Sequence, residues 1–327
     1  MNKIKNIGLL TSGGDAPGMN AAIRAVVRAG IYYDLKVTGV IRGFDGLVNG
    51  NFIDMERKSV ANIIQRGGTI LKTARSDRFR TEEGRQQAYD NLKANGIDAL
   101  VVIGGDGTFT GADVFMKEFD FPVIGLPGTI DNDLAGTDFT IGYDTAINTV
   151  INAVDKIRDT AESHNRLFVV EVMGRDSGLI ALRSGIGAGA EAILIPEIKS
   201  GMDDLITRLE HGRKDKASKI IIVAEGDEVG GGFDTCEVLK EKFPNYDIRF
   251  SVLGHIQRGG SPTCMDRVLA SRLGVSAVEG LINGHSGVMV GQLNREVVLT
   301  PFSQAIKHID VEDVTPAWLE LVGILSL

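Results

Sequence analysis

Short apolar runs that end in glycine-rich polar loops recur along this chain. Residues 6–11, 99–103 and 121–126 have the length and the largely apolar composition of buried parallel strands. Apolar residues recur at helical spacing in the segments between such runs, most clearly over residues 145–162. Strands that alternate with helices predict an α/β protein with parallel sheets.

The length of the chain predicts two domains. Its 327 residues, of which 43% are hydrophobic, exceed the size of one ordinary domain. Both halves alternate strand and helix patterns, so we expect two similar three-layer (αβα) Rossmann-like domains with mostly parallel sheets. Further strands are expected near residues 36–41, 167–172, 192–195, 220–224, 249–253 and 288–291, helices near 19–30, 60–65 and 111–117, and a loop over 43–46.

The net charge argues against two classes of partner, and the cysteine content indicates a reducing environment. A formal net charge of −8 argues against nucleic-acid and anionic-membrane binding, so an anionic substrate has to be held by local arginine clusters. Cys236 and Cys264 are far apart in sequence and lack metal-ligand spacing. No signal-peptide pattern is found, and no apolar run approaches the length of a membrane span. We therefore expect a reduced, cytoplasmic protein.

The polar hexapeptide GTIDND, residues 128–133, follows one of the expected strands at Pro127. Loops at the carboxyl ends of parallel strands are where open α/β sheets hold ligands. Asp131 and Asp133 could accept a proton from an attacking hydroxyl or hold a divalent cation. The alternative is an Asx-turn that caps the next helix.

Two glycine-rich turns connect a strand to a helix. Residues 12–18 (SGGDAPG) offer backbone N–H groups and a helix dipole to an anion, although many such turns are glycine-rich for steric reasons alone. Residues 104–108 (GGDGT) let the backbone approach a polyphosphate, and Asp106 could hold Mg²⁺ there. A tight structural turn is the alternative for this pentapeptide.

Several further side chains are candidates for anion binding. Arg75 lies in a polar, arginine-rich loop, where solvation of a helix face does not explain it. Arg175 follows the strand expected at 167–172, and His255 and Arg258 lie three residues apart in a glycine-flanked loop. His255 could equally be a hydrogen-bonded packing residue. Phe44 could stack on a base or pack in the core.

Taken together, these motifs resemble those of bacterial ATP-dependent 6-phosphofructokinases. The resemblance covers nearly the whole chain and is carried by LTSGGDAPGMNAAIR (10–24), VIGGDGT (102–108), GLPGTIDND (125–133), VVEVMGR (169–175), VAEG (223–226) and LGHIQRGGSP (253–262). It implies transfer of the ATP γ-phosphoryl group to the 1-hydroxyl of fructose 6-phosphate, the committed step of glycolysis. It also implies Mg²⁺ as cofactor and a homotetramer.

The resemblance assigns roles to individual positions. It makes Asp131 the catalytic base and Asp106 the magnesium ligand, and it places Thr129, Asp133, Arg175, Arg75 and Gly14 at the reaction centre. The implied ATP site comprises Gly14, Phe44, Arg75, Ser76, Gly104, Gly105, Asp106, Gly107 and Thr108. The implied fructose 6-phosphate site comprises Thr129, Asp131, Arg166, Met173, Gly174, Arg175, Glu225, Arg249, His255 and Arg258, with Arg166 and Arg249 supplied by a neighbouring subunit.

The resemblance further implies an effector site and a division into domains. The effector site, for ADP and phosphoenolpyruvate, comprises Arg24, Arg28, Arg57, Arg158, Gly189, Glu191, Lys214 and Lys216. On spacing alone, Arg24 and Arg28 could instead form a solvated helix face. Residues 1–141 plus 254–305 are expected to bind ATP, and residues 142–253 plus 306–327 fructose 6-phosphate.

Three alternative functions share some of these motifs. Pyrophosphate-dependent phosphofructokinases typically have Asp in place of Gly107 and Lys in place of Gly128, so both glycines favour ATP. NAD and lipid kinases share GGDGT but lack GTIDND and LGHIQRGG. A non-catalytic nucleotide-binding subunit is disfavoured because Asp106, Asp131 and Arg175 are all present.

Overall fold

The computed structural model of the chain describes residues 4–164, 166–198, 201–211, 218–226, 230–306 and 315–325. The chain divides into two compact units, residues 1–145 with 258–309 (unit 1) and 146–257 with 310–327 (unit 2). The boundaries expected from the sequence lay a few residues earlier, at 141/142, 253/254 and 305/306. Among the described residues, no helix combines the length and the apolar character needed to cross a bilayer.

Unit 1 is built on a sheet whose described strands run in the order β12-β11-β5-β4-β1-β2-β3, with β6 paired to β5. These strands are β1 (Asn6–Thr11), β2 (Lys36–Val40), β3 (Phe52–Asp54), β4 (Ala99–Gly104), β5 (Val123–Thr129), β6 (Ile141–Gly142), β11 (Val288–Leu293) and β12 (Glu296–Pro301). The pairs β2–β3 and β11–β12 are antiparallel, and the others are parallel. The prediction of a mostly parallel sheet is therefore confirmed.

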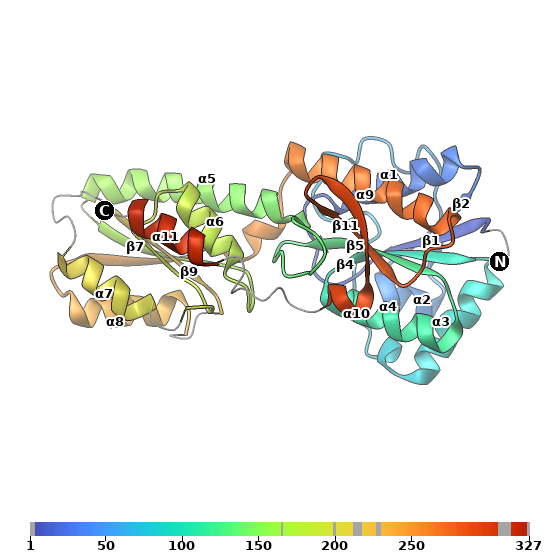
Figure 1. The fold of residues 1–327 in the computed structure, drawn as a ribbon, viewed down its shortest axis with the longest axis horizontal. Helices are drawn as coiled ribbons and strands as arrows, with labels where there is room; N and C mark the ends of the chain where they lie inside the picture. Colours follow the sequence, from blue (N-terminus) through green and yellow to red (C-terminus); the bar gives the residue numbers. More distant parts are fainter. Residues whose placement is uncertain are drawn as a thin grey trace. The chain divides into compact units, whose positions relative to one another are not determined.

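Helices cover both faces of this sheet (Figure 1). They are α1 (Met19–Tyr32), α2 (Gly43–Asn49), η1 (Arg78–Arg80), α3 (Glu82–Ala94), α4 (Asp106–Phe119), α9 (Cys264–Ile282) and α10 (Phe302–Ala305). Helices α1 and α9 lie together on one face, and α2, α3, α4 and α10 lie on the other. The result is a three-layer αβα unit.

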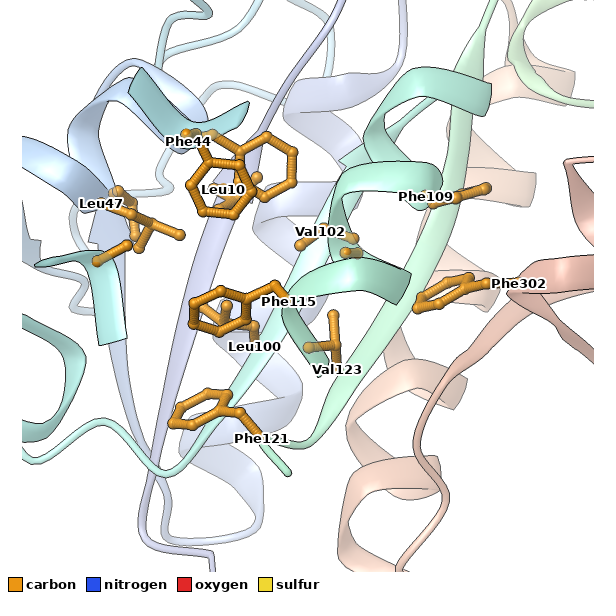
Figure 2. Close-up of a cluster of buried hydrophobic side chains, with 14 of the residues drawn as sticks. Leu10, Phe44, Leu47, Leu100, Val102, Phe109, Phe115, Phe121, Val123 and Phe302 are labelled. Atoms are coloured by element: carbon orange, nitrogen blue, oxygen red, sulfur yellow. The ribbon is translucent and has the colours of Figure 1, made fainter. Parts of the chain in front are cut away.

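Aromatic side chains fill the space between the sheet and the helices α2 to α4 (Figure 2). Strands β1, β4 and β5 are buried along their whole length, which explains their continuous apolar sequences. Phe115 of α4 packs against Phe121 and Phe79, and Phe109 stacks on Phe302. This layer anchors α4, the helix that carries the GGDGT motif at its start.

Unit 2 contains a smaller sheet with the order β10-β7-β9-β8, in which all pairs are parallel. Its strands are β7 (Arg166–Val172), β8 (Ala192–Leu194), β9 (Lys219–Ala224) and β10 (Asp247–Val252). Its helices are α5 (Tyr143–His164), which starts in unit 1, α6 (Leu179–Gly187), α7 (Gly201–His211), α8 (Gly232–Lys242), η2 (Gly254–Arg258) and α11 (Thr315–Leu325). Within this unit, α5, α6 and α11 lie on one face of the sheet and α7 and α8 on the other (Figure 1).

The structure corrects two of the local expectations. The loop expected over 43–46 is the start of α2, which is flanked by Arg42 and Gly50, both in the left-handed region. The helix expected over 60–65 is a series of turns instead. Asn62 has a φ of 54°, which interrupts a right-handed helix.

Two other elements are longer than the sequence suggests. Helix α4 starts at Asp106 rather than near residue 111, so most of the GGDGT motif belongs to its first turn. Strand β5 continues through Pro127 to Thr129, because its last residues pair with both neighbouring strands, β4 and β6. The expected loop therefore begins only at Ile130.

A half-buried ion pair fixes η1, the short helix next to the arginine-rich loop. Arg85 of α3 donates to both carboxylate oxygens of Glu118 on α4, at 2.5 and 2.6 Å. It also donates to the backbone oxygens of Phe79 and Arg80, at 3.2 and 2.7 Å. The hydrogen bond to Glu118 raises the pKa of Arg85. One guanidinium group thus joins α3, α4 and η1.

We expect Arg85→Ala to lower the free energy of unfolding by about 2–3 kcal/mol, because Glu118 loses its partner while two backbone carbonyls lose a donor. The cost stays below that of a fully buried pair, since Glu118 keeps 31% of its side-chain surface exposed. Denaturant titration measures the change. Lys117→Ala is the control: it breaks the exposed pair with Asp113 and should cost under about 1 kcal/mol. Equal losses in the two variants would contradict the prediction.

Candidate active site

The two glycine-rich turns lie side by side at the carboxyl ends of β1 and β4, two central strands of the unit 1 sheet. Strands β1 and β4 are parallel neighbours, with Thr11 opposite Ile103, so the loops that follow them emerge together. Ser12 N donates to Ile103 O at 2.9 Å, which ties the first turn to the end of β4. The sequence predicted each loop separately, and the register of the sheet brings them together.

The GGDGT motif forms the amino terminus of α4, a helix of 14 residues. Gly104 has no room for a side chain, because a Cβ atom there would lie 2.6 Å from Ser12 O. Gly107 is exposed and has no atom within 4 Å of the position of such a Cβ atom. The backbone N–H groups at this helix end are therefore approachable, which suits a phosphate group.

Thr108 adds a hydroxyl group to this helix end. Its side chain is 3% exposed, and Oγ1 has no hydrogen-bond partner among the described residues. A Cβ atom on Gly13, in the first glycine-rich turn, would lie 3.5 Å from this oxygen. A buried hydroxyl without a partner is costly in a folded protein. Thr108 is thus a polar group, between the two glycine-rich turns, that a bound ligand could satisfy.

Thr129 and Asp131 form a closed pair at the end of β5. Thr129 Oγ1 donates to Asp131 Oδ2 at 3.3 Å and accepts from Asp131 N at 3.2 Å. Asp131 is 2% exposed. A Cβ atom on Gly105 would lie 3.6 Å from Thr129 Cβ, so the pair is adjacent to the start of α4. A buried carboxylate in this position can accept a proton from a hydroxyl group held beside it.

Asn132 orders the loop, a role that the sequence did not indicate. Its side chain accepts from Thr140 N at 2.7 Å and donates to Asp138 O at 3.3 Å. Thr140 Oγ1 donates to Thr129 O at 2.7 Å. No helix follows the loop directly, because β6 comes next. The alternative of an Asx-turn that caps a helix is therefore wrong, and Asn132 instead closes the loop on itself.

The arginine-rich loop is held to α1 by a second asparagine. Asn20, 1% exposed, donates to Arg66 O and Gly67 O at 3.0 and 3.1 Å and accepts from Ile70 N at 2.8 Å. Three hydrogen bonds from one buried side chain fix residues 66–70. Sequence reasoning missed Asn20, because its partners lie more than 40 positions away.

Phe44 and Ser76 both contact Phe79. The Phe44 ring is 8% exposed and stacks on Phe79 with a centroid distance of 4.2 Å. Ser76 Oγ accepts from Phe79 N at 3.3 Å. The packing role that the sequence left open for Phe44 is therefore observed, and contact with a base stays a prediction. Arg75 is exposed next to Ser76.

Arg258 lies in unit 1, against the first glycine-rich turn. Its Nη1 donates to Asp15 O at 3.4 Å, and a Cβ atom on Gly14 would collide with its guanidinium group. A residue predicted for the sugar phosphate is therefore next to the turn predicted for ATP phosphates.

In unit 2, four predicted residues meet at the carboxyl ends of β7 and β9. Glu225 Oε1 accepts from Gly174 N and Arg175 N, at 3.3 and 2.9 Å. Arg175 has a φ of 54° and is exposed. Met173 N donates to Gln257 Oε1 at 3.3 Å. Glu225 thus fixes the backbone of the turn formed by Met173, Gly174 and Arg175. The side chains of Arg175 and His255 are both exposed.

Arg166 and Arg249 share one carboxylate on neighbouring strands. Arg166 Nε and Arg249 Nη2 donate to Asp247 Oδ2 at 2.7 and 3.3 Å, and these hydrogen bonds, chiefly that of Arg166, lower the pKa of Asp247. Strands β7 and β10 place Asp247 directly opposite Arg166. The arrangement preorients two guanidinium groups at one end of the unit 2 sheet.

The predicted effector residues fall on both units. In unit 1, burial and the charge of Arg28 lower the pKa of Arg24, and Arg57 is exposed. In unit 2, Arg158 donates to Ala188 O and Gly189 O at 2.5 and 3.2 Å. Glu191 accepts from Ile220 N. Lys214 and Lys216 lie outside the described residues. Burial and a neighbouring positive charge both disfavour the charged form of Arg24, and a bound anion would offset these effects.

A family model described as phosphofructokinase matches residues 6–281. The chain belongs to the phosphofructokinase family. It is 59% identical over 309 residues to a Bacteroides thetaiotaomicron protein named ATP-dependent 6-phosphofructokinase 2, covering 94% of this chain and 95% of that protein. It is 53% identical over 325 residues to ATP-dependent 6-phosphofructokinase 1 of Thermus thermophilus, covering 99% and 100% of the two. The predicted family is therefore confirmed.

Solved phosphofructokinase structures share the fold. The Saccharomyces cerevisiae phosphofructokinase matches with a TM-score of 0.89 at 38% identity, over 98% of this chain and 48% of that one. This chain thus spans about half the length of that yeast chain. A pyrophosphate-dependent phosphofructokinase from Marinobacter aquaeolei matches with a TM-score of 0.85 at 21% identity, over 98% and 91% of the two chains, which shows the fold alone. The predicted fold of two Rossmann-like α/β domains is confirmed.

Proposed function

We propose that this member of the phosphofructokinase family is an ATP-dependent 6-phosphofructokinase. It would transfer the ATP γ-phosphoryl group to the 1-hydroxyl of fructose 6-phosphate. The relatives that share 51–59% of their residues with it carry that name. The observation that carries the proposal is the proximity of the α4 amino terminus to the Thr129–Asp131 pair, because a Cβ atom on Gly105 would lie 3.6 Å from Thr129 Cβ. A phosphate site and a buried base are adjacent there.

The unit 1 residues divide the work of phosphoryl transfer between them. The backbone at Gly14 and Gly104 would hold the phosphates of ATP, and the Thr108 hydroxyl would donate to one of them. Asp131 would accept the proton of the attacking hydroxyl, with Thr129 fixing its carboxylate. Because phosphoryl transfer needs positioning and charge neutralisation more than covalent chemistry, a rigid loop is what this step requires.

Magnesium fits this site through Asp106. Among the described residues, no group of three or more His, Cys, Asp and Glu side chains could hold a metal by itself. Mg²⁺ usually binds one or two carboxylates together with substrate phosphates and water. Asp106, at the first position of α4 beside the open Gly107, offers one such carboxylate where the phosphates would lie. The ion would neutralise charge on the transferring group.

Thr129, Asp131 and Arg258 of unit 1 belong to the residues proposed for fructose 6-phosphate, and unit 2 contains the other seven. They are Met173, Gly174, Arg175, Glu225 and His255, with Arg166 and Arg249 serving a neighbouring subunit of a homotetramer. The Glu225 hydrogen bonds support this proposal, because they fix the turn that presents Arg175. We also propose ADP and phosphoenolpyruvate as effectors at the arginines described above, supported by the two neighbouring positive charges of Arg24 and Arg28 on α1.

A coupled assay with purified protein, fructose 6-phosphate and Mg²⁺ tests the proposal, with ATP offered in one reaction and pyrophosphate in another. Turnover with ATP alone is the expected result. Turnover with pyrophosphate, or with neither donor, would overturn it.

We expect Gly107→Asp to raise the KM for ATP by about tenfold or more, because a carboxylate would occupy the space of a phosphate and repel it. The fold should tolerate the change, since no atom lies within 4 Å of the new Cβ atom. Steady-state kinetics and a melting curve test both statements. Gly128→Ala is the contrast: a Cβ atom there lies 2.9 Å from Ile103 Cγ2, so stability should fall. An unchanged KM in Gly107→Asp would contradict the donor assignment.

A further inference from the structure

A buried carboxylate outside the predicted site joins the start of α9 to β6 and to the start of α5. Asp266 lies in the first turn of α9 and is 1% exposed. Its Oδ1 accepts from Gly142 N at 2.8 Å, and its Oδ2 accepts from Thr145 N and Thr145 Oγ1 at 2.8 and 2.5 Å. Burial raises the pKa of Asp266, and these hydrogen bonds oppose the shift. A carboxyl group is kept in such a place only when its partners satisfy it.

The groups that donate to Asp266 belong to the segment next to Thr129. Gly142 ends β6, which pairs in parallel with the last residues of β5, so that Gly142 is opposite Thr129. Thr129 in turn forms the closed pair with Asp131. A chain of direct contacts therefore leads from the Asp266 carboxylate through Gly142 to the proposed catalytic base.

The first glycine-rich turn packs against the same place. Gly18 and Gly142 have φ values of 111° and 108°, which glycine adopts without strain. A Cβ atom on Gly18 would lie 2.6 Å from Ile141 Cγ2 and 3.5 Å from Asp266 Cβ. One on Gly142 would lie 2.7 Å from Ala16 Cβ. The first glycine-rich turn, β6 and the start of α9 thus meet at Asp266.

Thr145 completes the junction. Its hydroxyl donates to Asp266 and accepts from Thr263 N at 3.0 Å, while Thr263 Oγ1 accepts from Asp266 N. One hydroxyl group therefore connects the start of α5 to the start of α9. Its loss would break both of these hydrogen bonds, at the start of the helix that follows β6 directly.

We propose that Asp266 is a positioning residue for phosphoryl transfer, which holds β6 and, through it, the Thr129–Asp131 pair in register with the phosphate-binding turns. The inference rests on the proposed function. It assigns Asp266 no contact with a substrate. Its effect should therefore appear in turnover rather than in binding, because small displacements of a reacting group slow a reaction severely.

The test compares kcat and KM in Asp266→Asn, Thr145→Val and Thr145→Ser. Asn replaces one acceptor oxygen by an NH₂ group that faces donors, and we expect kcat to fall about 10–100-fold with both KM values within about threefold. Thr145→Val, which lacks the hydroxyl, should lower kcat in the same direction. Thr145→Ser keeps the hydroxyl and should retain wild-type kcat. The Thr145 pair decides the question if Asp266→Asn does not fold.

Two controls separate positioning from general loss of stability. Glu279→Gln makes the same chemical change at the other end of α9, where Glu279 accepts from Tyr33 Oη at an exposed site. Leu92→Ala opens a cavity in the buried face of α3 and should lower the melting temperature at unchanged kcat.

The outcomes are distinct. Wild-type kcat in Asp266→Asn, or equal kcat in Thr145→Val and Thr145→Ser, would overturn the inference and leave the proposed function intact. The inference would also be overturned if Leu92→Ala had the same melting temperature as Asp266→Asn and showed the same loss of kcat. A wild-type protein without turnover would overturn the proposed function, and the inference with it. Hydrogen exchange over residues 128–145, measured in all variants, should be faster in Asp266→Asn than in Glu279→Gln.

Discussion

Asp131→Ser should lower kcat by about 100- to 10,000-fold while the KM values for ATP and fructose 6-phosphate change by no more than a few-fold. The expectation follows from the place of Asp131, which is buried, bonded to Thr129 and adjacent to the α4 amino terminus. A serine in its place cannot take a proton from the attacking hydroxyl at neutral pH. It leaves the phosphate-binding backbone untouched, so that binding should survive.

A coupled spectrophotometric assay gives kcat, and equilibrium titration of ATP gives binding. Asp90→Ser is the matched control, because it makes the same change at an exposed position of α3. Near-native turnover in Asp131→Ser would show that another group acts as the base. Loss of ATP binding together with turnover would show that the loop is structural instead.

The second large effect is expected at the helix that carries the phosphate site. Asp106→Asn should lower kcat/KM for ATP by about 100-fold or more and raise the Mg²⁺ concentration needed for half-maximal rate. The amide keeps the shape of the side chain but loses the charge that holds the ion. Stability should change by less than about 1 kcal/mol, the usual contribution of an acidic residue in a first helical turn.

Asp113→Asn controls for the loss of an acidic residue from the same helix. Asp113 lies two turns further along α4 and pairs with Lys117. It should have wild-type kinetics and an unchanged requirement for Mg²⁺. If Asp106→Asn showed the same Mg²⁺ dependence as the wild type, the assignment of the metal to Asp106 would be wrong.

In the sequence, Gly107 and Gly128 both favour ATP as the phosphoryl donor. In the structure, the absence of a side chain has a different physical reason at each of the two positions. Gly107 borders open space, so its hydrogen side chain leaves room for a ligand. Gly128 is enclosed by Ile103 and Met19, so packing alone demands glycine there. Only Gly107 is therefore a clean test of donor choice. A lysine at 128 would have to displace the core before it could meet a phosphate.

Local sequence determined most of the parallel strands of this protein, whereas β3, β6 and β12 were not expected from it. Buried strands such as β1, β4 and β5 are identifiable because continuous apolar runs leave few other structures open to them. The same holds for the glycine-rich turns, whose backbone requirements are met by few other residues. Where long-range packing or backbone strain decides, as at α2 and at Asn62, the expectation was wrong.

The motifs GGDGT and GTIDND were evident from the sequence by itself, with their chemistry, because each is local and contiguous. Their mutual placement was decided by the tertiary structure, since it depends on the pairing of β4, β5 and β6. The same is true of Asn20 and Asp266, which have ordinary sequence surroundings. Hydrogen bonds to distant backbone groups, up to 124 positions away for Asp266, give them their roles. A pattern within one segment cannot encode such partners, because the fold alone brings them within reach.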